Sequence, residues 1–287
     1  MPELPEVETI RTGLKTHVLL KRVEKVLVGL PKIVRGNLTE FQEVIQGNQF
    51  TDIDRIGKLL IFKLDTTDYF LILHLKMTGQ LIYPTHQEIV AGGHPFPEFT
   101  ADLPNKFTHV TFVFADGSRL FFNDLRQFGY LQLVTPQQLL LLKTQYGLEP
   151  TMDDFTWNHF QELLGERTTI LKSFLLNQKF ISGLGNIYAD ESAFAAGVRP
   201  DRKIQTLTLT ERKKLFTSIR EIIMSAIEHK GTTFRNYADS EGKKGGYAAL
   251  LQVYGRAGER CLRCGQADIQ KMKLAGRGTH YCPHCQS

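Results

Sequence analysis

The stretch MPELPEVET, residues 1–9, decides how the rest of the chain is interpreted. Removal of Met1 would leave Pro2 as the first residue, with a free secondary amine. The pKa of an α-amino group lies near ~7.7–8.0, below the ~10.4 of lysine, so such an amine is nucleophilic at neutral pH. The iminium that it forms with a sugar carbon keeps its positive charge and acts as an electron sink. The alternative is an unstructured terminus without chemistry.

The residues that follow predict a helix that would hold this terminus in place. Pro5 suits the first turn of a helix, Glu6 favours a helix N-terminus, and apolar side chains recur at helical spacing through residues 7–14. A helix anchored by its apolar face would fix the positions of Pro2 and Glu3. From spacing alone, a catalytic role for Pro2 stays the minority interpretation.

Length and composition predict a cytosolic globular protein. With 287 residues, 42% hydrophobic and 23% charged, the chain suits at least two domains with ordinary cores. No apolar run reaches the ~18–20 residues of a membrane span, and no signal peptide is evident, so we expect no membrane partner. The net charge of +5 permits a nucleic-acid partner without requiring one.

The first part of the chain, residues 1–135, is predicted to form an N-terminal β-sandwich. Strand-like apolar runs occupy residues 23–28, 59–64, 69–75, 110–114 and 118–122. Asp116-Gly117 between the last two runs is a strong hairpin signal. Several short strands at this spacing are typical of two packed sheets. The stretch 84–105, rich in Pro, Gly and His, is predicted to be a long loop.

From about residue 135 the pattern becomes helical, which predicts a second domain over residues 136–250. Helices are expected at 136–142, 157–164, 168–179 and 187–196, and after the capping-box sequence Thr208–Glu211. A polar, Gly-rich loop at 232–247 is predicted to be mobile. The last segment, residues 251–287, forms a third domain.

The third domain contains all four cysteines of the chain, Cys261, Cys264, Cys282 and Cys285. Two Cys-x2-Cys pairs separated by seventeen residues predict a tetrahedral Zn²⁺ site with four thiolate ligands. A segment this short lacks a core of its own and needs the metal to fold. A redox dithiol is the weaker alternative.

Other features remain open on residue pattern alone. The turn Gly183–Asn186 suits either an ordinary helix connection or a phosphate site, with Asn186 expected to cap the next helix. Arg277, between two glycines, is either an exposed loop residue or a phosphate ligand. Lys58 would ordinarily be solvated, and Met77 and Phe128 are predicted to be core residues.

These motifs together resemble bacterial formamidopyrimidine-DNA glycosylases over nearly the whole chain. The resemblance is carried by MPELPEVET at 1–9, GLGNIYADE at 183–191 and GRGTHYC at 276–282. It implies an α+β multidomain fold with a β-sandwich, a helix-two-turns-helix domain and a zinc finger. It also implies a monomeric bacterial base-excision repair enzyme, associated with the nucleoid. That enzyme removes oxidised purines, namely 8-oxoguanine and formamidopyrimidines, from double-stranded DNA, and then cleaves the abasic site by β,δ-elimination.

The resemblance also implies roles for individual residues. Pro2 would attack the sugar and Glu3 would act as general acid, while Lys58 and Arg277 would assist elimination. The implied DNA-binding residues are His74, Met77, His109, Arg126, Phe128, Arg167, Lys172 and Asn186. Among these, Met77, Arg126 and Phe128 would fill the gap left by the everted base. The single zinc ion would be structural, and the 232–247 loop would cover the oxidised base.

The chain departs from the family pattern at two positions and leaves two alternatives open. Phe107 stands where the family often has histidine, and Ser173 stands where it often has proline. One alternative is an endonuclease VIII-type glycosylase for oxidised pyrimidines, which Leu4 disfavours. The other is a non-catalytic zinc-ribbon DNA-binding protein, which the intact Pro2-Glu3 pair disfavours.

Overall fold

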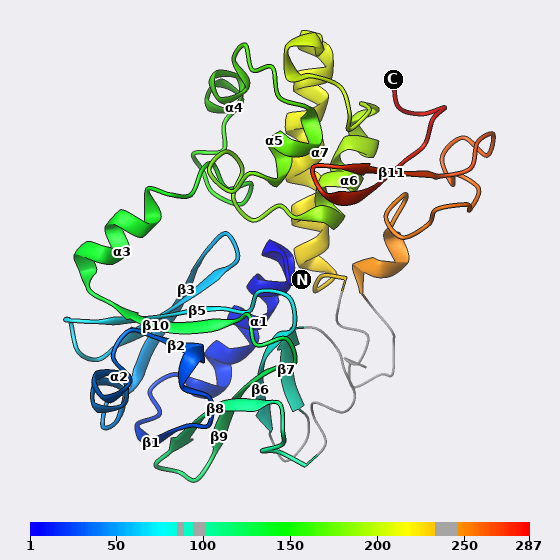
Figure 1. The fold of residues 1–287 in the computed structure, drawn as a ribbon. Coiled ribbons are helices and arrows are strands. Elements are labelled where there is room, and N and C mark those ends of the chain that lie inside the picture. The colour runs from blue at the N-terminus through cyan, green and yellow to red at the C-terminus, as the bar shows by residue number, and fades with distance from the viewer. Residues whose placement is uncertain (85–88, 94–101, 233–245) are drawn as a thin grey trace. The chain divides into compact units, whose positions relative to one another are not determined.

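The computed structural model describes residues 1–84, 89–93, 102–232 and 246–287. The chain forms two compact units, one from Met1–Thr144 with Lys230–Gly245 and the other from Gln145–His229 with Gly246–Ser287. Figure 1 shows both units as a ribbon and labels many of their helices and strands. The predicted loop at 232–247 lies mostly outside the described residues, and the bounds of the three predicted domains stay predictions.

The first unit contains two five-stranded sheets. One has the order β1 (Val23–Val28), β8 (Thr108–Phe114), β9 (Arg119–Asp124), β6 (Gly79–Pro84) and β7 (Ile89–Gly93). The other has the order β2 (Val34–Arg35), β10 (Tyr130–Val134), β5 (Phe70–His74), β4 (Leu59–Leu64) and β3 (Phe50–Ile56). Neighbouring strands are antiparallel except β2 and β10, which are parallel. The sequence prediction of a single loop over 84–105 is therefore wrong, because β7 pairs with β6 inside it.

Strand β4 is buried on both faces of its sheet. Leu60 and Phe62 enter the main core, which also contains buried side chains of the other sheet. Leu59 and Ile61 point to the opposite face and join a second cluster with Leu139 of α3 (Pro136–Lys143). Successive strand residues face opposite sides, so a strand buried on both faces is a continuous apolar run.

Helix α1 (Leu4–Val18) belongs to the same main core as the two sheets. Val7, Ile10, Leu14 and Val18 are buried there, which confirms the helix that the spacing predicts. Two short helices complete this unit, namely η1 (Pro31–Ile33) and α2 (Leu38–Ile45), the latter capped by the Asn37 side chain.

The second unit is helical with a small terminal hairpin. Its elements are α4 (Trp157–Leu164), α5 (Leu171–Leu176), α6 (Asn186–Ala196), η3 (Ile204–Thr206), α7 (Leu209–Glu228), η4 (Tyr247–Leu250), β11 (Gln270–Leu274) and β12 (Arg277–Tyr281). Most of α6 is buried, since it packs against α5, α7 and β12. The capping box at Thr208 and Glu211 is confirmed, whereas the helix predicted over 168–179 is shorter and ends at Leu176.

The observed mixture of β-sheets and helices confirms the predicted α+β class. Within the described residues, no helix has both the length and the apolar content that a membrane span requires.

Candidate functional site

The N-terminal residues of the first unit are buried at the start of α1. Pro2 and Glu3 are both enclosed, and Glu3 is the N-cap residue of the helix. Glu6 Oε2 accepts a hydrogen bond from the Glu3 backbone N–H at 2.8 Å. Its other oxygen, Oε1, accepts from the backbone N–H of Thr232 at 2.8 Å and from its hydroxyl at 3.1 Å. One buried carboxylate therefore fixes residue 3 and residue 232 together.

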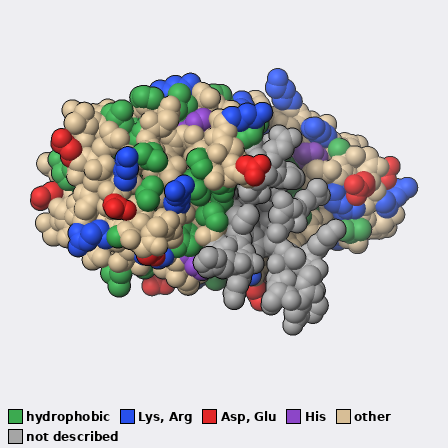
Figure 2. Space-filling model, turned by 90° about the horizontal axis from the view of Figure 1, so that it is seen from below, with side chains coloured by type: hydrophobic (Ala, Val, Ile, Leu, Met, Phe, Trp, Pro, Cys, Tyr) green, Lys and Arg blue, Asp and Glu red, His purple; other side chains and the backbone are tan. Residues whose placement is uncertain are grey.

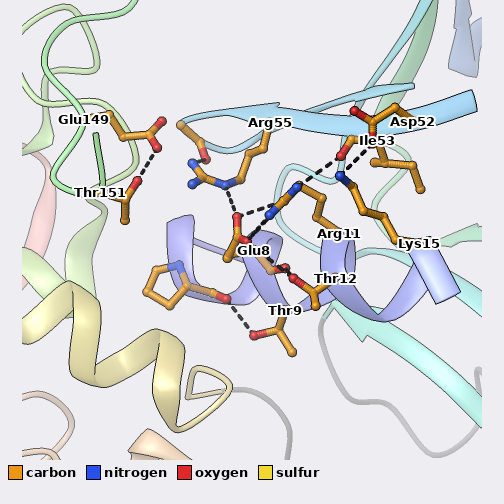
Figure 3. Close-up of polar contacts among 12 residues, drawn as sticks. Glu8, Thr9, Arg11, Thr12, Lys15, Asp52, Ile53, Arg55, Glu149 and Thr151 are labelled. Carbon is orange, nitrogen blue, oxygen red and sulfur yellow. Dashed lines mark hydrogen bonds and ion pairs between the residues drawn. The ribbon is translucent and has the colours of Figure 1, made fainter. Parts of the chain in front are cut away.

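A second carboxylate attaches α1 to strand β3 (Figure 3). Glu8 Oε1 lies 2.5 Å from Arg11 and Oε2 lies 2.9 Å from Arg55 Nε. Burial raises the pKa of Glu8, but the hydrogen bonds from Arg11 and Arg55 outweigh it and lower the pKa overall. Arg55 also donates to the carbonyl oxygen of Gly57 at 3.1 Å. The helix that follows Pro2 and Glu3 is thus attached to the turn that carries Lys58.

Lys58 and His74 lie at the same end of neighbouring strands. Lys58 is only 6% exposed and precedes Leu59, whose register partner on β5 is His74. His74 Nδ1 accepts the backbone N–H of Lys76 at 3.0 Å, so Nε2 carries the proton in the neutral ring. Burial, with the charges of Lys76 and Lys58, lowers the pKa of His74 to about 3. The ring is therefore a neutral N–H donor at pH 7.

Two cations that the sequence analysis did not single out lie beside this histidine. The Arg35 guanidinium carbon is 3.4 Å from the ring centroid of Tyr130, and Lys76 Nζ is 5.7 Å from it. Tyr130 is the register partner of His74 on β10. Among the described residues, neither Arg35 nor Lys76 has a carboxylate partner. Such a cluster attracts anions, and only the parallel pairing of β2 with β10 reveals it.

Arg126, Met77 and Phe128 form a cluster on two adjacent loops. Arg126 Nη1 lies 2.9 Å from the Met77 sulfur, and its guanidinium carbon lies 4.7 Å from the Phe128 ring centroid. The prediction from pattern that Phe128 is a core residue is wrong, because 52% of it is exposed, and Met77 is only partly buried. An exposed aromatic ring stacked with arginine suits contact with bases.

The loop that carries Arg126 and Phe128 is organised by Asp124. Its buried carboxylate accepts the backbone N–H of Gly129 at 2.7 Å and that of Arg126 at 3.2 Å. His109 Nε2 lies 2.7 Å from the Asp124 carbonyl oxygen, which only accepts, so His109 donates there. The imidazole of His109 is buried and supports this loop.

The DNA-binding candidates of the second unit lie around α5 and α6. Arg167 Nε donates to the Leu163 carbonyl oxygen at 2.6 Å, and its guanidinium stacks on Phe180. Lys172 is completely buried. The prediction that Asn186 caps α6 is wrong, because Gly185 is the N-cap residue and the Asn186 side chain donates to Gly278 of the hairpin at 2.9 Å.

Arg277 lies at the tip of the β11–β12 hairpin. Ala275 and Gly276 adopt positive φ angles of 48° and 71°, which turn the chain sharply before it. The side chain of Arg277 is exposed, and among the described residues it has no hydrogen-bond or ion-pair partner. Its guanidinium is therefore available to bind an anion.

The four cysteines of the second unit form one cluster. Their sulfur atoms all lie within 4.8 Å of one another. Cys261 and Cys285 sulfurs are 3.9 Å apart, and those of Cys264 and Cys282 are 3.8 Å apart. A tetrahedron with Zn–S bonds of ~2.3 Å requires sulfur separations of roughly 3.8 Å. The residues therefore fit one zinc ion with four protein ligands.

On the one face that Figure 2 shows, positive charge is spread out rather than concentrated. On the face drawn in Figure 2, Lys and Arg side chains alternate with hydrophobic and acidic ones where the described residues are visible. The local clusters of charged side chains are therefore a better guide to a binding surface than the net charge. The predicted residues are divided between the two units, with Pro2, Glu3, Lys58, His74, Met77, His109, Arg126 and Phe128 in the first and the others in the second.

Three family models match consecutive parts of the chain. They describe the formamidopyrimidine-DNA glycosylase N-terminal domain at residues 1–131, the formamidopyrimidine-DNA glycosylase H2TH domain at 146–238, and a zinc finger found in FPG and IleRS at 258–287. The helix-two-turns-helix and zinc-finger parts of the predicted fold are thereby confirmed.

Relatives with known names match over the full length. Formamidopyrimidine-DNA glycosylase of Heliobacterium modesticaldum is 42% identical, and that of Pelotomaculum thermopropionicum is 41% identical, with at least 99% of each chain covered. Solved structures of the Lactococcus lactis Fpg protein also match. Its complex with DNA containing an abasic site has a TM-score of 0.86 at 37% identity, with 99% of both chains covered. Its complex with DNA containing an oxidised pyrimidine has a TM-score of 0.85 at 36% identity, with both chains fully covered.

Proposed function

Since the chain belongs to the formamidopyrimidine-DNA glycosylase family, and is therefore a zinc-finger DNA glycosylase of base-excision repair, we propose that it excises oxidised purines and cleaves the resulting abasic strand through Pro2. The purines are 8-oxoguanine and formamidopyrimidines in double-stranded DNA. The observation that carries the proposal is the burial of Pro2 and Glu3 at the start of a helix that Glu6 and Glu8 hold in place.

The reaction begins once Met1 has been removed. The Pro2 nitrogen attacks C1′ of the damaged nucleoside, a new N–C1′ bond forms, and the bond to the base breaks with its electron pair leaving on the base. The proton that the Pro2 nitrogen loses neutralises the departing base. Glu3 donates a proton to the ring oxygen as the sugar opens, so that an iminium joins Pro2 to C1′. The role of Glu3 follows from its place directly beside Pro2, the proposed nucleophile.

The iminium then withdraws electrons during two eliminations. Loss of a proton from C2′ breaks the bond to the 3′ phosphate, and a second elimination breaks the bond to the 5′ phosphate. Lys58, enclosed at the end of the same sheet as His74, supplies a proton or contacts a phosphate. Arg277 binds a phosphate from the hairpin tip and assists the second step.

The zinc ion supplies structure and no chemistry, because four cysteines would occupy all its tetrahedral positions. They hold together a segment that has only a small core of its own.

The surface of the first unit supports binding to the strand that carries the lesion. His74 offers a neutral N–H to a phosphate, and Arg35 and Lys76 add charge beside it. Met77, Arg126 and Phe128 would replace the stacking that is lost when the base is everted, with Arg126 facing the orphaned cytosine.

His109, Arg167 and Asn186 remain DNA-binding candidates by resemblance. We further propose that the protein acts as a cytosolic monomer associated with the nucleoid.

Preference for oxidised pyrimidines is the second candidate. It is favoured by the match to the Lactococcus lactis protein, which is described in complex with DNA containing an oxidised pyrimidine. Competing duplexes that contain 8-oxoguanine opposite cytosine or thymine glycol decide between the two, because each candidate predicts which base leaves faster.

Borohydride trapping tests the catalytic proposal directly. Reduction of the iminium should give a covalent protein–DNA adduct whose tryptic peptide carries the sugar on Pro2. The intact mass of the protein shows beforehand whether Met1 is absent, since an acylated prolyl nitrogen cannot react. No adduct with duplexes containing 8-oxoguanine, an abasic site or an oxidised pyrimidine would refute the mechanism and favour a non-catalytic DNA-binding protein.

A further inference from the structure

Hydrogen bonds of the Asn186 and Asp190 side chains join the zinc-binding hairpin to helix α6. Asn186 Nδ2 donates to the Gly278 carbonyl oxygen at 2.9 Å, and the His280 backbone N–H donates to Asp190 Oδ2 at 2.9 Å. Gly278 and His280 follow Arg277 by one and three residues on β12. Asn186 and Asp190 are four residues apart, so they lie on one face of the helix. Strand β12 is therefore aligned along this face, with Arg277 at its start.

Asp190 is itself held by a buried lysine. The side chains of Lys172 and Asp190 are both 0% exposed, and Lys172 Nζ lies 2.5 Å from Asp190 Oδ1. The same ammonium donates to the Asn186 carbonyl oxygen at 3.1 Å. A buried ion pair contributes little net stability, but it fixes geometry, and removal of one partner leaves an uncompensated charge. An ammonium enclosed in this way has no surface to present to a DNA phosphate.

We propose that Asp190 is a positioning residue for Arg277 and that Lys172 acts through it. In this arrangement Lys172 orients the Asp190 carboxylate, which then holds the His280 backbone and so sets where the hairpin tip presents Arg277. Lys172 thus supports strand cleavage from the protein interior instead of contacting DNA. The consequence for cleavage rests on the proposed function of Arg277, whereas the attachment of the hairpin does not.

Two double variants isolate the contact with His280. Lys172→Met/Asp190→Asn and Lys172→Met/Asp190→Ala both remove the buried charges, so neither leaves an unpaired ion in the interior. Asparagine retains an oxygen that accepts the His280 N–H, whereas alanine does not. Both proteins are studied as full chains, with the zinc content measured first, and each serves as the control for the other.

Hydrogen exchange of the His280 amide reports the attachment without any reference to activity. We expect exchange in the alanine variant to be roughly tenfold faster than in the asparagine variant, the factor that corresponds to one lost buried hydrogen bond. Equal exchange rates in the two zinc-loaded variants would overturn the proposal.

Strand cleavage of an abasic duplex, measured in single turnover, reports the effect on Arg277. We expect the alanine variant to cleave roughly tenfold more slowly than the asparagine variant. Addition of Arg277→Ala should slow cleavage by a smaller factor in the alanine variant than in the wild type, because both changes act on the contact that Arg277 makes with DNA. Fully additive losses would refute positioning. If Arg277→Ala alone leaves wild-type cleavage unchanged, the proposed role of Arg277 fails, and the exchange comparison still decides whether Asp190 holds the hairpin.

The salt dependence of DNA binding separates Lys172 from a phosphate ligand. A phosphate contact contributes ~0.9 to the slope of log affinity against log salt. We expect the Lys172→Met/Asp190→Asn variant to keep the wild-type slope. A slope reduced by about 0.9 would show that Lys172 contacts a phosphate and would contradict the proposal.

Discussion

Glu6 Oε1 accepts hydrogen bonds from both the backbone N–H and the hydroxyl of Thr232, a residue 226 positions away along the chain. The other carboxylate oxygen holds the backbone of Glu3. This buried carboxylate therefore connects the proposed general acid with the segment that follows helix α7. Gly231 leaves room for it, since a Cβ at that position would lie 2.6 Å from Glu6 Oε1.

Glu6→Gln should slow base removal more than it weakens DNA binding. The amide keeps one acceptor oxygen but turns an NH2 group toward one of the two N–H donors, so either Glu3 or Thr232 loses its partner. We expect base removal to fall by roughly tenfold or more, the effect of one lost buried hydrogen bond to a charged group. Single-turnover excision and equilibrium binding measure the two effects.

Glu24→Gln is the matched control, because Glu24 is an exposed carboxylate on β1 of the same unit. It should leave excision unchanged. Equal rates for Glu6→Gln and the wild type would show that the connection between residues 3 and 232 has no role in the reaction.

Glu3→Gln should abolish base release while leaving DNA binding intact. The amide has nearly the same shape, but it cannot donate a proton to the opening sugar as a carboxylic acid does. Excision of 8-oxoguanine in single turnover, compared with binding to the same duplex, checks this expectation. Loss of binding in parallel with excision would mean that Glu3 acts in folding or recognition instead of as an acid.

His74 should make the protein less stable as the pH falls below neutrality. Its folded pKa is about 3, against about 6.5 in an unfolded chain, so between these values the unfolded state binds more protons. The free energy of unfolding then falls by up to about 1.4 kcal/mol per pH unit. Above pH 6.5 the residue contributes no pH dependence.

His74→Gln removes this titrating group. The unfolding free energy of the variant should therefore vary less steeply between pH 6.5 and 4 than that of the wild type. Denaturant titrations by circular dichroism measure the difference, because the one tryptophan, Trp157, belongs to the second unit. His159→Gln, at an exposed histidine, is the control. Parallel curves for His74→Gln and the wild type would contradict the neutral, partly buried imidazole.

Local signals in the sequence predicted the elements well. Helix α1, strand β4 and the capping box at Thr208 follow from side-chain periodicity and from residues three positions apart. The Cys-x2-Cys pairs predicted the metal site because the ligands of each pair are close along the chain. Such features depend on short-range geometry, which a sequence displays directly.

Contacts between distant segments could not be predicted. The position of Arg35 over Tyr130 depends on a parallel pairing of strands that lie far apart along the chain. Asn186 was expected to cap a helix, but a hairpin 92 residues further on takes its side chain instead. Phe128 was expected in the core because no local pattern shows that Asp124 holds its loop outward.

Arg35→Ala should weaken DNA binding and reduce its salt dependence. If the guanidinium contacts one phosphate, the slope of log affinity against log salt should fall by ~0.9. Titrations at several salt concentrations with a lesion duplex measure the slope. Arg119→Ala, at an exposed arginine on the other sheet, is the control and should keep the wild-type slope. Equal slopes for the two variants would exclude Arg35 from the DNA-binding surface.

Removal of zinc should unfold the cysteine-bearing segment and leave the first unit folded. Four thiolates around one ion provide most of the structure of residues 258–287, since their own core is small. Hydrogen exchange after chelation should show fast exchange in β11 and β12 and unchanged protection in β4. Arg277 would then lose its fixed position, so second-step cleavage of an abasic strand should fall, while borohydride trapping at Pro2 continues. Cys264→Ser should reproduce the effect of chelation. Retained protection of β12 in the metal-free protein would mean that the bonds from α6 to the hairpin, and not the metal, hold Arg277 in place.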